Sequence, residues 1–342
     1  MTATAPTTLH RSRRSARPVW SVVSVAVLAA VVLLSVTVGA RAVGVDEVLA
    51  GLTGASGTVG EAAVAVRLPR TVLAVVVGAS LALAGTVMQG VTRNPLADPG
   101  ILGVNAGASL AVVAGMAWFG LSAAVATMWV AVGGAAVAAV FVYVVGSLGR
   151  GGATPLKLAL AGAASSAAFA SLVVAVSLPR GDIAEGVRSW QIGGVGGATS
   201  DRIVQVLPFL VVGALLCTAT AKGLNTLALG DDLAAGLGER VALTRALAAT
   251  GAVLLCGAST AVAGPIGFVG LVVPHAYRLL VGTDHRWLLP LSAVGGAVLL
   301  VAADVLGRVV ARPEEIDVGI VTAIVGAPVF IAIIRRRKVR SL

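Results

Sequence analysis

Long apolar runs recur from one end of the chain to the other, and short polar segments separate them. An α-helix needs about 20 mainly apolar residues to cross a bilayer. Ten runs reach or approach that length, and we predict membrane-spanning helices at 19–40, 70–91, 100–118, 122–146, 155–178, 202–221, 241–263, 266–282, 287–310 and 317–334. The runs at 100–118 and 266–282 are short and interrupted by Gly or Pro, which predicts broken or tilted helices inside the protein. The predicted fold class is an all-α polytopic membrane protein.

The apolar pattern also contains a repeat. A shift of 179 positions places GASLALAG at 78–85 on GASTAVAG at 257–264, and Pro95 on Pro274. The copies fall on the second and seventh predicted spans, so they cross the membrane in opposite directions. An inverted repeat of this kind is typical of transporters, and it predicts two halves at about 70–178 and 241–334. The small residues are expected to serve mainly helix–helix packing, because lipid gives helices little hydrophobic drive to associate.

Composition and charge agree with this pattern. The chain is 58% hydrophobic and 12% charged, whereas soluble domains carry about 25% charged residues. With the N-terminus inside, 17 of the 25 basic residues fall in inside segments, as the positive-inside rule requires. We therefore predict a cytoplasmic basic tail at 1–18, one membrane domain at 19–336 and a cytoplasmic tail at 337–342. Because membrane orientation accounts for the net charge of +10, no nucleic-acid partner is predicted.

The predicted cytoplasmic loop at 222–240 reads KGLNTLALGDDLAAGLGER. We predict two helical pieces, the first ended by Gly230 and the second capped by Asp231 or Asp232. Three leucines recur at every fourth position of the loop: Leu229, Leu233 and Leu237. This apolar stripe either packs back onto the membrane helices or docks into a groove on a partner protein. The sequence alone leaves both interpretations open.

Residues with catalytic or metal-binding potential are few and scattered. The two cysteines, Cys217 and Cys256, lie in apolar segments and are interpreted as core residues. The three histidines show no ligand spacing, and no GxxxxGK[ST] motif for nucleotide phosphates is present. We predict no catalytic residue, no metal site and no cofactor bound by this chain.

Several motifs converge on one family. They are RLPR at 67–70, GxxLAxxGxxxQxxxRNPLADPxxLG at 78–103, LGDDLAAGLG at 229–238, AGPIGFVGLVVPHAYRLLVGTDHRWLLPLSA at 263–293, ADVLGR at 303–308 and VGIVTAIVGAPVFI at 318–331. Together they cover roughly 60–336 and resemble the FecCD-type permease subunits of iron–siderophore and cobalamin ABC importers. The resemblance implies ten helices per subunit and pairing with a second permease, either an identical copy or a paralogue, around a central path. It also implies two cytoplasmic ATPases, which use the ATP, and an extracytoplasmic substrate-binding protein.

The resemblance assigns roles to individual residues at the outer face. Three arginines match family positions at which external arginines engage glutamates of the binding protein: Arg67, Arg70 and Arg308. The predicted topology independently places all three outside. The alternative to docking is that these arginines form salt bridges with Glu61 or Glu314 in the loops. Relatives usually carry Pro at the position of Asp317, so the local loop shape is expected to differ.

At the inner face the resemblance points to a loop and a turn. The segment from Leu229 to Gly238, including Gly230, matches the coupling loop that enters the ATPase groove, although relatives often carry Glu where this chain has Asp231 and Asp232. Asn94 and Leu96 fall in the turn that narrows the inner mouth of the path.

The predicted function is transport by a subunit that is not itself an enzyme. The permease of an ATP-driven importer in the inner or plasma membrane would pass a ferric siderophore inward by alternating access, with haem or cobalamin as alternative cargo. A secondary transporter driven by an ion gradient is a further alternative, and it should carry ionisable residues within its spans. Only Asp304 and Arg308 lie deep in a predicted span, one helical turn apart, and we interpret them as a local ion pair.

Overall fold

The computed structural model describes residues 16–39, 43–54, 57–148 and 154–338. Seven of its helices are long and apolar enough to cross a membrane: α2 (Arg17–Thr37), α4 (Val59–Thr92), α6 (Ala124–Ser147), α7 (Pro155–Ser177), α9 (Ser200–Ala219), α12 (Val241–Ala263) and α14 (His285–Val310). Shorter apolar stretches form α5 (Val104–Phe119) and α13 (Val269–Val281) and most of α15 (Val318–Lys338). Every one of the ten predicted spans therefore coincides with a helix. Parts of the two predicted tails, 1–15 and 339–342, lie outside the described residues.

Short helices connect the spans, and some begin where the hydrophobic pattern gives no signal. They are α3 (Val45–Leu52), the 3₁₀-helix η1 (Pro99–Leu102), α8 (Gly181–Ile192), α10 (Ala221–Leu227) and α11 (Asp231–Gly236). The prediction was wrong for the start of α4, which begins at Val59 and not at 70. The Thr58 hydroxyl accepts a hydrogen bond from the Glu61 amide, and the Glu61 carboxylate accepts one from the Thr58 amide. This capping box starts the helix before its apolar section.

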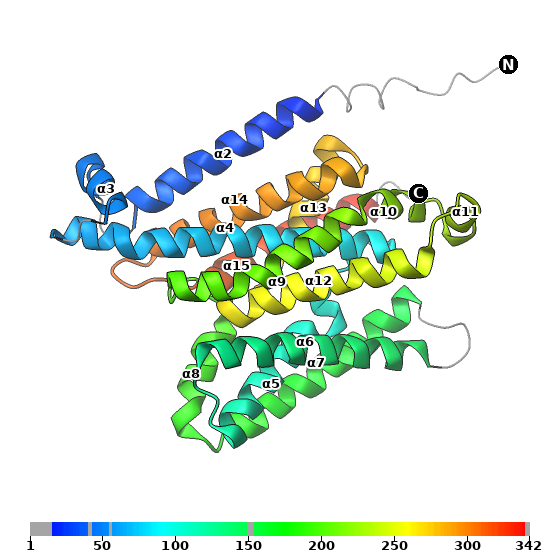
Figure 1. The fold of residues 1–342 in the computed structure, drawn as a ribbon, viewed down its shortest axis with the longest axis horizontal. Coiled ribbons are helices and arrows are strands. Elements are labelled where there is room, and N and C mark those ends of the chain that lie inside the picture. Colours follow the sequence, from blue (N-terminus) through cyan, green and yellow to red (C-terminus); the bar gives the residue numbers. More distant parts are fainter. Residues whose placement is uncertain (1–15, 40–42, 55–56, 149–153, 339–342) are drawn as a thin grey trace.

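Helix α4 lies at the centre of the bundle between α12, α13 and α14 (Figure 1). Glycine contacts make this close packing possible: a Cβ on Gly78 would overlap the carbonyl of Gly296 in α14, and one on Gly85 would overlap the backbone of Gly270 in α13. The repeated small-residue face of α4 is buried against other helices. The packing interpretation of this face is therefore confirmed.

The repeat has the predicted inverted orientation in its two principal helices. Arg93, at the C-terminal end of α4, and Arg245, in the first turns of α12, both contact Asp231. The two helices pack against each other, so they run in opposite directions. The correspondence does not extend to the following segments, because Pro95 lies in a turn after α4 whereas Pro274 lies within α13.

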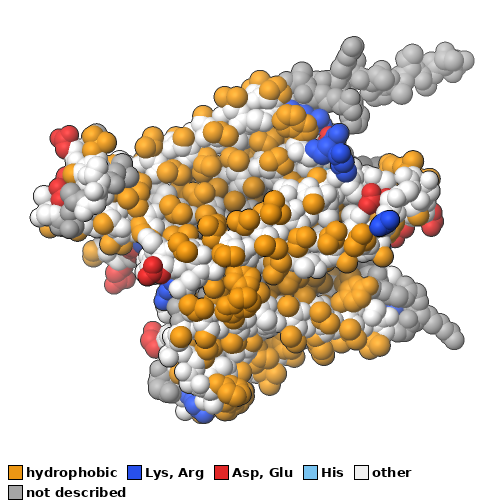
Figure 2. Space-filling view, viewed as in Figure 1, with side chains coloured by type: hydrophobic (Ala, Val, Ile, Leu, Met, Phe, Trp, Pro, Cys, Tyr) orange, Lys and Arg blue, Asp and Glu red, His pale blue; other side chains and the backbone are white. Residues whose placement is uncertain are grey.

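The bundle has an apolar side surface and two polar ends. Hydrophobic side chains cover the side, and Lys, Arg, Asp and Glu gather toward the ends (Figure 2). Helices α10 and α11 lie at one end with the start of α2, and α3 and α8 lie at the other (Figure 1). We refer to these as the α11 end and the α8 end. An apolar belt between two polar ends is the arrangement that a multi-pass membrane protein requires.

Candidate functional site

A buried charged cluster occupies the α8 end of the bundle. Asp304 in α14 is 1% exposed, and its Oδ1 accepts a hydrogen bond of 2.8 Å from Nε of Arg70 in α4. Its Oδ2 lies 3.0 Å from Nη2 of Arg308, one turn farther along α14. The predicted local ion pair between Asp304 and Arg308 is therefore confirmed, and Arg70 joins it from another helix.

Two arginines of this end also hold the last turn of α2. Arg308 donates hydrogen bonds to the carbonyls of Ser35 and Val38, and Arg67 donates to the carbonyls of Val36 and Thr37. The final carbonyls of a helix have no partner within it, and its C-terminal dipole favours positive charge. These side chains therefore fasten α2 to α4 and α14.

The three predicted docking arginines are all buried in this structure: Arg67, Arg70 and Arg308. Arg70 pairs with Glu315, at 2.5 Å, and with Asp304, and not with Glu61 or Glu314, the alternative partners named from the sequence. Glu61 instead caps α4. Glu315 is the exposed member of the cluster, with 40% of its side chain accessible. Sequence reasoning missed it, although it lies next to Glu314 in the loop before α15.

At the α11 end, the leucine stripe is exposed. Leu229, Leu233 and Leu237 are 58%, 63% and 69% accessible, so the stripe does not pack back onto the helices. The two predicted helical pieces are present as α10 and α11, but the predicted cap is wrong. Gly230, with a φ of 109°, is the N-cap, and no side chain caps the helix. The carboxylate of Asp231 instead accepts hydrogen bonds from Arg93 and Arg245.

Asp231 connects three segments that are separate in the sequence. Its Oδ1 accepts hydrogen bonds of 2.8 Å from Nη2 of Arg93 and 2.9 Å from Nη2 of Arg245, and its Oδ2 lies 2.9 Å from Nη1 of Arg245. We call these three residues the Asp231 clasp. Sequence reasoning missed both arginines, although Arg93 stands in the RNPLADP motif directly before Asn94.

The turn after α4 contains the predicted gate residues Asn94 and Leu96. Arg93 ends α4 in the left-handed region, with a φ of 51°. Oδ1 of Asn94 accepts a hydrogen bond of 3.0 Å from the Leu96 amide, and the Leu96 side chain is 38% exposed. The Asp98 carboxylate then accepts from the Gly100 amide and caps η1. The structure thus brings the predicted gate turn beside the predicted coupling loop, and the Asp231 clasp joins them.

A second polar contact at the same end links α10 to α14. Asn225 donates a hydrogen bond of 2.7 Å to Asp284, which also binds Arg286 and lies 3.7 Å from Arg17. The hydrogen bond from Arg286 is the main reason that the pKa of Asp284 lies well below its usual range. Asp284 stays ionised at any physiological pH and holds the start of α2, α10 and α14 together.

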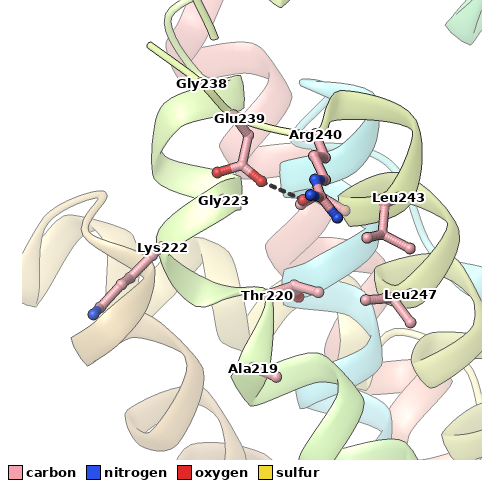
Figure 3. A pocket seen from close by; sticks show the side chains of 10 residues that line it. Ala219, Thr220, Lys222, Gly223, Gly238, Glu239, Arg240, Leu243 and Leu247 are labelled. Carbon is pink, nitrogen blue, oxygen red and sulfur yellow. Dashed lines mark hydrogen bonds between the residues drawn. The ribbon is translucent and has the colours of Figure 1, made fainter. Parts of the chain in front are cut away.

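A pocket of about 340 Å³ lies next to the leucine stripe, between the end of α9, α10 and the start of α12 (Figure 3). The Glu239 carboxylate accepts a hydrogen bond from the Thr244 hydroxyl, and the Lys222 side chain extends away from both. Leu243 and Leu247 form an apolar wall. The exposed surface at this end therefore combines apolar and polar groups, as protein interfaces do.

Within the described ranges, no group of three His, Cys, Asp or Glu side chains could hold a metal ion. The buried thiol of Cys256 instead lies 3.3 Å from Oδ1 of Asn105, which also accepts a hydrogen bond of 2.9 Å from Thr260. These polar groups bind one another between α5 and α12.

Comparison with known proteins decides the family. The profile of the FecCD transport family matches residues 27–336. The chain belongs to the FecCD transport family. Among curated FecCD-like relatives, the probable siderophore transport permease YfiZ of Bacillus subtilis (strain 168) is 46% identical over 272 residues, which cover 79% of this chain and 81% of YfiZ. The ferric enterobactin permease FepD of Escherichia coli (strain K12) is 42% identical over 309 residues, 89% of this chain and 91% of FepD.

The FecCD fold agrees with a solved structure. This chain is similar to a metal-chelate type ABC transporter in an inward-facing conformation, with a TM-score of 0.80, 26% identity, and coverage of 93% of this chain and 99% of that one. The chain is thus an all-helical, multi-pass membrane protein with the architecture of an ABC transporter permease, as the sequence motifs indicate.

Proposed function

We propose that this FecCD member is the permease subunit of an ATP-driven importer that carries a ferric siderophore inward. The observation that carries the proposal is the exposed leucine stripe, which has Leu233 in α11 and Leu229 and Leu237 on either side of it, at the end of a membrane bundle that belongs to this family. Three large apolar side chains in contact with water are unfavourable unless a partner covers them. A cytoplasmic ATPase dimer with a groove for α11 is the partner proposed here, and the α11 end is accordingly the cytoplasmic end.

The proposed cycle is alternating access. Closure of the two ATPases on ATP would displace α11 in each of two paired permease subunits and open or close the turn that contains Asn94 and Leu96. Cargo would enter from a binding protein docked at the α8 end. This chain contributes the path and the contacts, and ATP is hydrolysed by its partners.

Siderophore cargo is supported by the names of the relatives, YfiZ and FepD, which are permeases for siderophore and ferric enterobactin transport. Haem and cobalamin remain the alternative cargoes. An ion-driven secondary transporter is disfavoured by the state of Asp304, the carboxylate that the sequence places deep in a predicted span: it is 1% exposed and held by Arg70 and Arg308. An ion site would need a carboxylate that can exchange its partner.

The decisive test of function is uptake into proteoliposomes that contain the permease with its ATPase, supplied with its binding protein. We expect uptake of one or more ferric siderophores only when ATP is inside with the ATPase, and no response to a proton or sodium gradient. A panel of ferric siderophores, haem and cobalamin then identifies the cargo. Uptake that follows an ion gradient without ATP would contradict the proposal.

We also propose that the outer arginines, Arg67, Arg70 and Arg308, take part in binding-protein docking. Because Arg308 faces Asp304 in the interior, reversal of its charge would test folding and not docking. Arg67→Gln is the better variant, because Arg67 donates to the carbonyls of Val36 and Thr37 and Gln keeps an amide group that can donate to a carbonyl. We expect binding-protein affinity to fall about tenfold, mainly through slower association and with weaker salt dependence.

The matched control for docking is Arg240→Gln, which removes an arginine at the α11 end of the bundle. Binding to the purified permease can be measured by surface plasmon resonance at several salt concentrations. Equal affinities for Arg67→Gln, Arg240→Gln and the unchanged permease would exclude Arg67 from docking.

A further inference from the structure

The Asp231 clasp joins the segment proposed to meet the ATPase to the turn proposed to gate the path. Arg93 ends α4 and begins the turn, Asp231 begins α11, and Arg245 lies in the first turns of α12. We propose that Arg93 is a positioning residue that transmits displacement of α11 to the Asn94–Asp98 turn through Asp231. This inference rests on the proposed function, because it assumes that α11 is the element that the ATPase moves.

The geometry at Asp231 distributes its contacts unequally. Arg245 approaches both carboxylate oxygens, at 2.9 Å each, and ties α11 to α12. Arg93 reaches only Oδ1, at 2.8 Å. Among the described hydrogen bonds and ion pairs of residues 93–98, this is the only one to α11. Movement of α11 therefore acts on the turn through one guanidinium group.

Stability alone does not account for the clasp. The side chains of Arg93, Asp231 and Arg245 are 43%, 41% and 35% exposed, and ion pairs so accessible to water add little to folding stability. A partner that covers α11 would exclude water from them. Charge pairs strengthen as the surrounding dielectric falls, so the clasp would be firmest when the ATPase is engaged.

Two hydrogen bonds within the turn connect its residues. The Asn94 side chain binds the Leu96 amide, and the Asn94 carbonyl accepts a hydrogen bond of 3.1 Å from the Ala97 amide. A cavity of about 20 Å³ separates the turn from Leu158 and Ala159 at the start of α7. A shift of Arg93 would thus carry the whole turn toward or away from α7.

The helix before the turn is fixed, which confines the displacement. Gln89, one turn before Arg93, donates a hydrogen bond of 2.9 Å to the Gly270 carbonyl of α13. Its Oε1 accepts one of 2.7 Å from Nη2 of Arg278. Because Gln89 anchors α4 to α13, a displacement of Arg93 would change the backbone between Gln89 and Arg93. The part of α4 before Gln89 would stay in place.

The test is a double-mutant cycle in the complete transporter, reconstituted with its ATPase and binding protein. Arg93→Gln, Asp231→Asn and the double variant are compared with the unchanged permease. Arg286→Gln is the matched charge-loss control at the same end, because Arg286 also pairs with an aspartate, its side chain is 61% exposed and it lies outside the pocket beside the stripe. The readouts are substrate transported per ATP hydrolysed and the amount of ATPase that co-purifies. We expect each single variant to lower transport per ATP about fivefold or more. Because Arg93 lies outside α11, Arg93→Gln should change ATPase co-purification by less than about twofold.

The cycle separates transmission from simple loss of structure. If Arg93 acts through Asp231, the double variant is no worse than either single variant, because one link has been cut twice. Unchanged transport per ATP in Arg93→Gln, or effects that multiply in the double variant, would overturn the inference. Failure of the proposed function is distinguishable, because the unchanged permease itself would then show no ATP-dependent uptake.

Discussion

A permease carrying Leu233→Asp is expected to lose its partner ATPase while it keeps its own fold. Leu233 is 63% exposed at the centre of the stripe. In the free permease the new carboxylate therefore lies in water, and the fold is expected to stay intact. In the proposed complex the same carboxylate would be buried without a partner, which is costly. Loss of a central apolar anchor alone costs about 2–4 kcal/mol. Together these effects predict a loss of affinity of about 100-fold or more.

Co-purification of tagged permease with the ATPase, followed by stimulation of ATP hydrolysis by the loaded binding protein, measures this effect. Ala235→Asp is the matched control, since it adds the same charge to an exposed position of α11 two residues away, off the leucine face. We expect Ala235→Asp to retain much more ATPase than Leu233→Asp. If Leu233→Asp still co-purified with a stimulated ATPase, the assignment of α11 as the coupling helix would be wrong.

The second large effect is expected at Asp304, where Asp304→Asn should destabilise the membrane fold. The substitution keeps the shape of the side chain but leaves Arg308, which is 2% exposed, without its ion-pair partner. Removal of one member of a buried ion pair costs about 3–5 kcal/mol, because the remaining charge stays buried. Arg70 keeps Glu315, so the loss is concentrated on Arg308.

Thermal unfolding of the purified protein in detergent, read by loss of monodisperse protein on size exclusion, measures the change. Glu185→Gln is the control: Glu185 and Arg188 form an ion pair of 3.9 Å with side chains 87% and 71% exposed, and such pairs contribute about 1 kcal/mol at most. The buried cluster would be shown to be dispensable if Asp304→Asn unfolded at the same temperature as Glu185→Gln.

The helices could be predicted from sequence because a bilayer leaves the chain few alternatives. Backbone groups in lipid must bond within their own segment, so an apolar run of sufficient length becomes a helix. Even the short runs at 100–118 and 266–282 gave α5 and α13. Errors fell where local polar chemistry decided the boundary: the capping box at Thr58 lengthened α4, and Gly230 capped α11 in place of an aspartate.

The sequence predicted the positions of the candidate site residues better than it predicted their contacts. The motifs brought attention to Arg67, Arg70 and Arg308 at one end, and to Leu233 and its neighbours at the other. They gave no indication that the arginines are buried, because burial depends on where the last turn of α2 and Asp304 lie. These partners are as many as 273 positions distant in the chain.

By itself, therefore, the sequence determined the spans, the inverted orientation of the repeat, the family and the apolar stripe of the loop at 222–240. Each of these follows from local composition or from a contiguous motif. Only the tertiary structure decided that the outer arginines hold α2 and Asp304, and that Asp231 joins Arg93 to Arg245. A charged side chain chooses its partner by distance and by the water around it, and both are set by how the helices pack.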